Sequence, residues 1–188
     1  MELKIDFKMG DFSLSPKDIS YIEEYIDVYE DFPNPGISFK DLSRVYTCPD
    51  RVEMIIDYFT DLLEDRKPDC IIGCDARGFI LGSFLSQAMG LPLVLARKPG
   101  KLPGELISKT YDLEYGSAEL QMQKHIISKY KSPVIADDVL ATGGTVKAIT
   151  EMLNSIGIEV NSYVFLSEIE FLNGRLNLSS DVFSILKS

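Results

Sequence analysis

The 188-residue sequence contains few cysteines, one histidine and no long hydrophobic run. Its three cysteines, Cys48, Cys70 and Cys74, are too few and odd in number for a disulfide framework, which favours buried reduced thiols in a cytoplasmic protein. With His125 as the only histidine, they cannot assemble a Cys/His metal cluster. The N-terminus has no apolar signal-peptide segment, and polar residues, glycine and proline interrupt the most apolar stretch, 78–96. We therefore expect neither a signal peptide nor a membrane span.

Basic residues are also scarce: Lys and Arg total 19 against 29 Asp and Glu, so the formal net charge is −10. Such a chain is repelled on average by nucleic acids and anionic membranes, which argues against both as partners. An anionic small ligand is still compatible, because a pocket can be locally positive. The hydrophobic fraction of 45% and the charged fraction of 26% are those of a folded globular protein. We expect one domain over residues 1–188, with 1–15 as an N-terminal extension.

Short apolar segments alternate with amphipathic ones through most of the chain. Ser15 and Pro16 predict the start of a first helix, and Asp50 is expected to cap a second. This alternation is typical of an α/β fold with a central, mostly parallel sheet flanked by helices, whose ligands bind at the carboxyl ends of the strands. The expected strands are 69–73, 91–96, 134–137 and 158–166, and the expected helices between them are 77–89 and 145–156.

Two turn-rich segments interrupt this rhythm. Residues 31–36 read Asp-Phe-Pro-Asn-Pro-Gly, which predicts a rigid turn. Residues 97–109 form an expected loop with four basic side chains, and 111–116 alternate enough to predict a short antiparallel ribbon. Loops of this length are often functional lids, and the concentrated positive charge favours a lid over a solvated surface loop, the remaining alternative.

The segment 134–145 carries the strongest functional pattern. An apolar strand ends in Asp137 and Asp138, and a turn containing Gly143 and Gly144 leads into a helix. Glycines and a helix N-terminus present backbone N–H groups to a phosphate, while paired carboxylates accept hydrogen bonds from a vicinal diol. Together they predict a site for a ribose 5-phosphate. The alternative is two solvated acids beside a helix-capping turn.

This pattern resembles the phosphoribosyl-diphosphate (PRPP) binding motif of the type I phosphoribosyltransferase family. Four further segments occur in the order typical of the adenine-using branch of that family, and the resemblance covers about residues 20–188. These segments are 31–36, 76–79, 97–104 and 113–116.

The resemblance implies the type I phosphoribosyltransferase fold, with a small N-terminal hood at 31–41 and a flexible lid loop at 97–117. It also implies an enzyme of purine salvage that transfers the phosphoribosyl group of PRPP to N9 of adenine. The products would be AMP and diphosphate. The expected cofactor is Mg²⁺, and the expected assembly is a homodimer.

Particular residues take roles by the same resemblance. Asp137 and Asp138 would hold the ribose hydroxyls, directly or through water bound to Mg²⁺. Arg77 would reach the diphosphate beside a cis peptide expected near Asp75. The 5-phosphate would be held by Ala141, Thr142, Gly143, Gly144 and Thr145, and the diphosphate would also be neutralised, partly across a dimer interface, by Arg97, Lys98 and Lys101.

The base and the reacting centre have their own implied residues. The backbone at Ser38 and Lys40 would read the edge of adenine while Phe39 stacks on it. Glu114 would act as the acid/base residue near N7 of the purine, and Tyr115 would close over the reacting centre. Arg77, Glu114 and Tyr115 are thus the expected catalytic residues.

Three alternatives stay open at this stage. One is a phosphoribosyltransferase for another purine base, against which the 31–40 segment speaks by resemblance. Another is a non-catalytic PRPP-binding regulator, although no basic N-terminal segment suitable for DNA is present. A plain interaction module would bind AMP without turnover.

Overall fold

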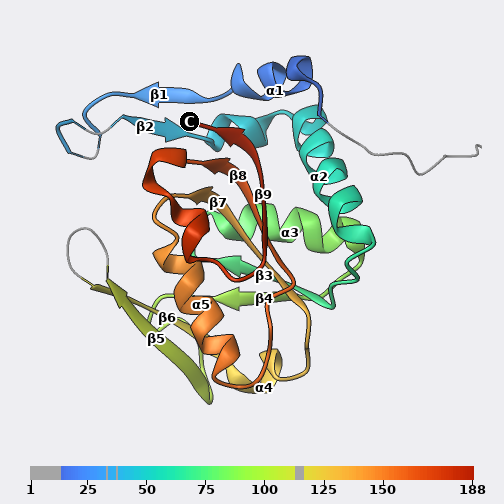
Figure 1. Cartoon of the computed structure of the whole chain (residues 1–188), viewed down its shortest axis with the longest axis vertical. Coiled ribbons are helices and arrows are strands. Elements are labelled where there is room, and N and C mark those ends of the chain that lie inside the picture. Colours follow the sequence, from blue (N-terminus) through green and yellow to red (C-terminus); the bar gives the residue numbers. More distant parts are fainter. Residues whose placement is uncertain (1–13, 33, 37, 113–116) are drawn as a thin grey trace, which may run out of the picture.

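A computed structural model describes residues 14–32, 34–36, 38–112 and 117–188. Its centre is a five-stranded sheet in which every neighbouring pair is parallel (Figure 1). The strands lie in the order β4 (Leu93–Ala96), β3 (Cys70–Cys74), β7 (Pro133–Leu140), β8 (Ser162–Glu168) and β9 (Asp181–Lys187). The four predicted strands and their parallel arrangement are confirmed, with bounds shifted by a few residues.

The edge strand β9 was not predicted from the sequence. It follows two short 3₁₀ helices, η2 (Glu170–Leu172) and η3 (Gly174–Asn177), instead of an α-helix. The strand–helix–strand pattern that predicts a parallel strand is therefore absent here.

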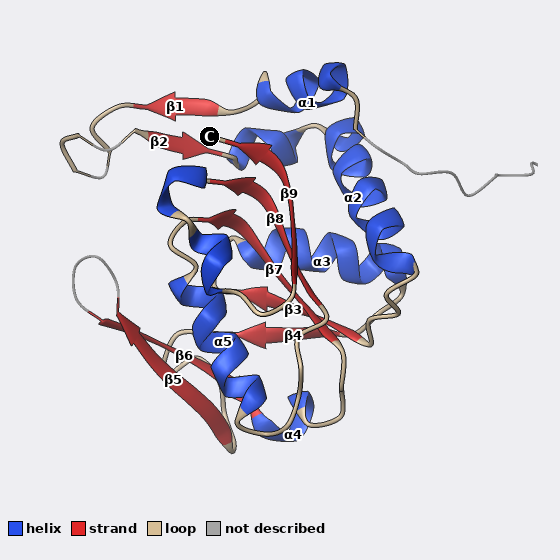
Figure 2. Cartoon of the chain, in the orientation of Figure 1, coloured by secondary structure: helices blue, strands red, loops and turns tan. Residues whose placement is uncertain are grey.

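Helices cover both faces of the sheet (Figure 2). One face carries Ile71, Val134 and Val164, which pack with side chains of α2 (Pro49–Glu64) and α3 (Gly78–Met89). The alternate residues of the same strands, Ile72, Ile135 and Phe165, pack on the other face with α5 (Gly144–Asn154). Since consecutive strand residues point to opposite faces, two apolar clusters on one sheet follow directly from the continuous apolar strands.

In Figure 1 the N-terminal part lies along the top of the view, beyond the edge strand β9. It contains α1 (Pro16–Glu23), the antiparallel pair β1 (Asp27–Tyr29) and β2 (Phe39–Asp41), and the 3₁₀ helix η1 (Ser43–Thr47). Ser15 caps α1 in a capping box with Asp18, which confirms the predicted start of this helix.

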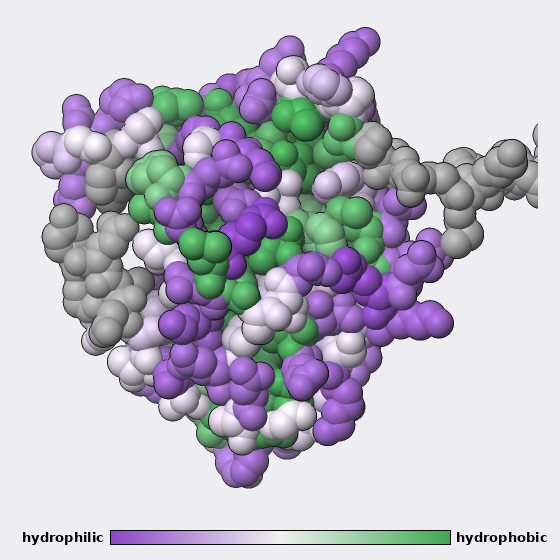
Figure 3. Space-filling model, in the orientation of Figure 1, coloured by the Kyte–Doolittle hydropathy of each residue, from purple (hydrophilic) through white to green (hydrophobic). Residues whose placement is uncertain are grey.

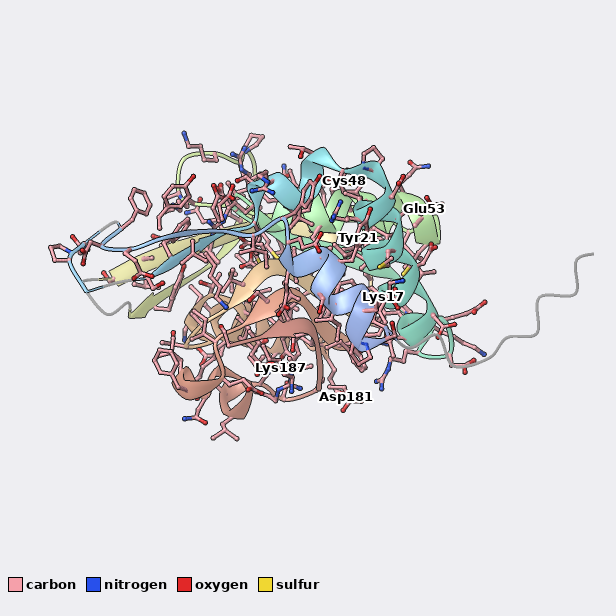
Figure 4. All side chains as sticks on the ribbon, turned by 90° about the horizontal axis from the view of Figure 1, so that it is seen from above. Lys17, Tyr21, Cys48, Glu53, Asp181 and Lys187 are labelled. Atoms are coloured by element: carbon pink, nitrogen blue, oxygen red, sulfur yellow. The ribbon has the colours of Figure 1, made fainter. Side chains whose placement is uncertain are left out.

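The prediction that Asp50 caps the next helix is wrong. Pro49 occupies the first helical position of α2, so the cap falls on Cys48 and Asp50 lies in the first turn. Cys48 is also only half-buried, unlike Cys70 and Cys74. In Figure 4 it lies near Tyr21 of α1, and the two helices are joined there by Arg51, whose guanidinium stacks 3.6 Å from the ring centroid of Tyr21.

The expected loop at 97–109 is shorter than predicted, and the ribbon is longer. Strand β5 (Leu106–Asp112) pairs antiparallel with β6 (Ser117–Gln123), so residues 106–109 belong to the ribbon. Ile107 and Tyr111 pack against the core beside α5, while Ser108 and Thr110 are exposed. This alternation is typical of a strand, and it begins before residue 111, where the ribbon was predicted to start. A short helix, α4 (Lys124–Ile127), follows.

The surface shown in Figure 3 is mainly polar, and apolar residues appear between the polar ones in patches. Among the described residues, no helix is long and apolar enough to cross a membrane.

We expect Phe59→Ala to lower the free energy of unfolding by about 3–5 kcal/mol. Phe59 of α2 is fully buried in the cluster beneath the hood, so its removal leaves a cavity. Urea unfolding followed by circular dichroism measures the change. Phe171→Ala is the matched control, because Phe171 is 77% exposed. Equal effects of the two substitutions would contradict this account of the core.

Candidate active site

The turn between β7 and α5 is shaped by two glycines from distant parts of the chain. Gly143 adopts a left-handed φ of 81°, which few other residues tolerate. A Cβ on Gly174 would lie 2.1 Å from the carbonyl oxygen of Ala141, and a Cβ on Gly143 would lie 2.7 Å from that of Gly174. The segment at Gly174 therefore presses directly against the turn. Asn177 adds a hydrogen bond of 3.0 Å to the carbonyl oxygen of Thr142.

This turn encloses a cavity of about 70 Å³. Its size suits one small group, since a water molecule takes about 30 Å³ in the liquid. The N-terminus of α5 opens into it and contributes unpaired N–H groups with a positive partial charge. A cavity of this kind would suit a phosphate group, the ligand that the sequence predicts here. Its lining includes Asp137 and all five predicted phosphate-binding residues, Ala141, Thr142, Gly143, Gly144 and Thr145.

The antiparallel ribbon reaches this turn from the side. The Thr145 hydroxyl donates a hydrogen bond of 3.4 Å to the hydroxyl of Tyr111 on β5. Lys109 on the same strand forms an ion pair of 2.7 Å with Glu151 of α5. The start of the ribbon is thus anchored on the phosphate-binding turn and its helix.

Asp137 and Asp138 lie within β7, which continues to Leu140 instead of ending at the acid pair as predicted; Asp138 is buried and Asp137 is half-buried. Burial raises the pKa of Asp137 well above its usual range, and the charge of Asp138 adds to this. Burial also raises the pKa of Asp138, with Arg77 opposing the effect. Gly78 makes room for the pair, because a Cβ there would lie 2.7 Å from Asp137 Oδ1. Two carboxylates held together in this way favour a bound cation or hydrogen-bond donors.

Arg77 connects the acid pair to the hood. Its Nε lies 2.6 Å from Asp138 Oδ2, and its guanidinium lies 5.5 Å from the ring centroid of Phe39. Phe39 in turn makes an edge-to-face contact of 5.1 Å with Phe32. Three predicted site residues from three elements therefore meet at one point.

The basic residues after β4 lie at the neighbouring strand end. Arg97 Nε is 3.2 Å from Asp75 Oδ2, and the backbone N–H of Lys98 donates to the same oxygen at 3.4 Å. The cis peptide expected near Asp75 is found between Asp75 and Ala76. The side chains of Lys98 and Lys101 are exposed.

The remaining predicted residues divide into two groups. Ser38 donates a hydrogen bond of 3.0 Å to Glu30 Oε1, whereas Lys40 lines a separate cavity with residues of α1 and β9. The role predicted for Lys40 belongs to its backbone, which reads the edge of adenine, and it stays a prediction. Glu114 and Tyr115 lie outside the described residues.

Several residues of the site had no recognisable sequence signal. Gly174 and Asn177 support the phosphate-binding turn from more than thirty positions away, and Asp75 binds Arg97 across two strands. Tyr111 was expected only as part of the ribbon. Tertiary contacts alone bring these residues to the site.

The family profile of the phosphoribosyl transferase domain matches residues 41–185. The chain therefore belongs to the phosphoribosyl transferase domain family, and the expected type I fold is confirmed by structural comparison. The crystal structure of adenine phosphoribosyltransferase from Thermoanaerobacter pseudethanolicus has a TM-score of 0.85 and 40% identity, covering 90% of this chain and 99% of that one. The enzyme from Saccharomyces cerevisiae, solved with an imino-altritol bisphosphate and adenine, has a TM-score of 0.85 and 35% identity over 90% and 98% of the two chains.

Sequence relatives place the chain more narrowly within that family. It is 44% identical to the adenine phosphoribosyltransferase of Butyrivibrio fibrisolvens, over 87% of this chain and 91% of that one. The corresponding protein of Geotalea daltonii is 45% identical, over 84% and 92%. The chain thus groups with the adenine phosphoribosyltransferases, as the resemblance implied.

We expect Gly174→Ala to weaken the affinity for ribose 5-phosphate about ten-fold, because the added methyl group displaces the turn at Ala141 and overpacking of this kind typically costs 1–3 kcal/mol. Isothermal titration calorimetry measures the affinity. Leu176→Ala is the control in the same 3₁₀ helix, since Leu176 is 82% exposed. Unchanged affinity in Gly174→Ala would show that the turn does not depend on this contact.

We expect Asp137→Asn to raise the free energy of unfolding at neutral pH and to weaken the binding of ribose 5-phosphate. The raised pKa means that the native state binds a proton more tightly than the unfolded state, so wild-type stability falls as pH rises above about 4. Asparagine carries no charge and avoids this loss, so the gain should grow from pH 4 upward. Urea unfolding at several pH values tests it, with the exposed Asp57→Asn as control. A difference independent of pH would contradict the assignment.

Proposed function

We propose that this chain transfers the 5-phosphoribosyl group of PRPP to N9 of adenine and releases AMP and diphosphate. The observation that carries the proposal is the meeting of Arg77, Asp138 and Phe39 beside the phosphate-binding turn. It joins an anion-binding residue, a ribose-binding residue and a base-stacking residue. The identity to adenine phosphoribosyltransferases over most of the chain supports the same reaction.

The proposed reaction breaks the bond between the anomeric carbon and the diphosphate and forms a bond from that carbon to N9. Diphosphate leaves with the electron pair, so positive charge develops on the sugar ring. The carboxylates of Asp137 and Asp138, once they hold the ribose hydroxyls, would favour this charge. Arg77, Arg97, Lys98 and Lys101 would stabilise the departing diphosphate. Attack from the opposite face inverts the anomeric centre from α to β.

Adenine would lie between Phe39 and the peptide groups of Ser38 and Lys40. An N–H and a carbonyl from one stretch of backbone match the N1 acceptor and N6 donor of adenine. Hypoxanthine presents O6 and N1–H instead, leaving unpaired groups that cost about 1–3 kcal/mol each. By resemblance, Glu114 would donate or share a proton with the base, or mainly hold the closed lid, and Tyr115 would help the lid 97–117 to exclude water.

We propose Mg²⁺ as the cofactor, bound mainly to PRPP. Among the described residues no cluster of three or more His, Cys, Asp or Glu side chains could hold a metal, so the acid pair suits contact through water or a ribose oxygen. The buried negative charge of Asp137 and Asp138 fits a nearby cation. When bound, Mg²⁺ would neutralise charge on the diphosphate.

We further propose a cytoplasmic homodimer. The free thiols of Cys48, Cys70 and Cys74 support a reducing compartment. The exposed side chains of Lys98 and Lys101 support a role in which these residues reach a diphosphate bound by a second copy. Sedimentation velocity tests the dimer.

A turnover assay with PRPP and Mg²⁺ tests the reaction against adenine, hypoxanthine, guanine and xanthine separately. We expect AMP and diphosphate in equal amounts from adenine and at least a hundred-fold lower kcat/KM for the other bases, about what two unpaired groups would cost. Another nucleotide as the main product would overturn the base assignment but keep the reaction class. Binding of PRPP without turnover of any base would indicate a regulator.

A further inference from the structure

Two buried polar atoms beside the acid pair lack hydrogen-bond partners among the described residues: Tyr46 Oη and Asp138 Oδ2. One is a hydroxyl that can donate, and the other is a carboxylate oxygen that accepts. Arg77 Nε lies 2.6 Å from Asp138 Oδ2 as an ion pair, but its N–H is not aligned for a hydrogen bond. Buried polar atoms are usually paired, so this couple calls for an explanation.

The fold places the two atoms on the same side of the sheet. Tyr46, on η1, packs against the cluster that contains Val134 and Ala136 of β7. Asp138 follows Ala136 by two residues, and alternation along a strand therefore directs it to the same face. Leu166, which lies opposite on β8, also belongs to that cluster.

Burial and the nearby carboxylates keep the Tyr46 hydroxyl protonated. Burial raises the pKa of Tyr46, and the carboxylates of Asp138 and Asp137 raise it further, while Arg77 opposes them. The hydroxyl is therefore a donor that faces negative charge. The phenol ring lines an apolar groove between α2 and α3 with side chains such as Ile56 and Phe84, so its position is set by packing.

We propose that Tyr46 is a positioning residue for PRPP binding, whose hydroxyl holds the Asp138 carboxylate through one bridging water. This inference rests on the proposed function. The side chain of Arg77 is 45% exposed and is also the group expected to bind the diphosphate. When Arg77 turns to that anion, it leaves Asp138, and Tyr46 keeps the carboxylate oriented toward the ribose hydroxyls.

Tyr46→Phe tests this role, because it removes the hydroxyl and retains the ring packing. The loss of one hydrogen bond should raise KM for PRPP about three- to ten-fold. The KM for adenine should stay unchanged, since Asp138 does not contact the base. Tyr58→Phe, on the neighbouring helix α2, is the matched control and should change neither constant. A lower urea midpoint for Tyr46→Phe with an unchanged KM for PRPP would overturn the proposal.

A double-mutant cycle tests the pairing without substrate, so its result does not depend on the proposed reaction. Tyr46→Phe should lower the urea midpoint of the wild-type chain, and this decrease should disappear in the Asp138→Ala background. The effect of Tyr58→Phe should be equal in both backgrounds. An equal decrease for Tyr46→Phe in the two backgrounds, or no decrease in the wild type, would overturn the pairing. If wild-type turnover fails while this coupling is found, the proposed function is wrong and the pairing stands.

Discussion

The site depends on one electrostatic constraint, the removal of two adjacent carboxyl groups from water within the central strand β7, near its carboxyl end. Taking Asp137 and Asp138 out of water is unfavourable, as their raised pKa values indicate. Neighbouring elements meet this constraint in different ways. Gly78 begins α3 without a side chain that would collide with Asp137, and Arg77 places a positive charge beside Asp138. Proteins keep such destabilising groups mainly at functional sites, where the same groups bind a ligand.

Three segments that are separate in the sequence meet near the carboxyl end of β7. The turn after β7 forms the anion cavity, the hood supplies Phe39, and the strand end after β3 supplies Arg77. Parallel strands bring their carboxyl ends to a single edge, so segments far apart in sequence converge there. The hood reaches that edge through Phe39, whose ring centroid lies 5.5 Å from the guanidinium of Arg77. This topology explains how one small α/β fold assembles a site for a phosphate, a sugar and a base.

Much of this arrangement could be predicted from sequence because its signals are local. Continuous apolar strands, the capping residue Ser15 and the acid pair with its Gly-Gly turn each depend on neighbouring residues, and the structure confirms them. The edge strand β9 could not be found in this way, since no α-helix precedes it. Gly174 and Tyr46 were also missed, because their roles arise only when distant segments pack together.

The contact between Gly174 and the phosphate-binding turn has a consequence for how the chain matures during synthesis. A ribosome releases the acid pair and its turn well before residues 174–177 emerge. The turn therefore lacks its support from Gly174 and Asn177 until the segment between β8 and β9 has been made. A nascent chain, or one shortened before residue 174, holds the motif without the contacts that shape its turn.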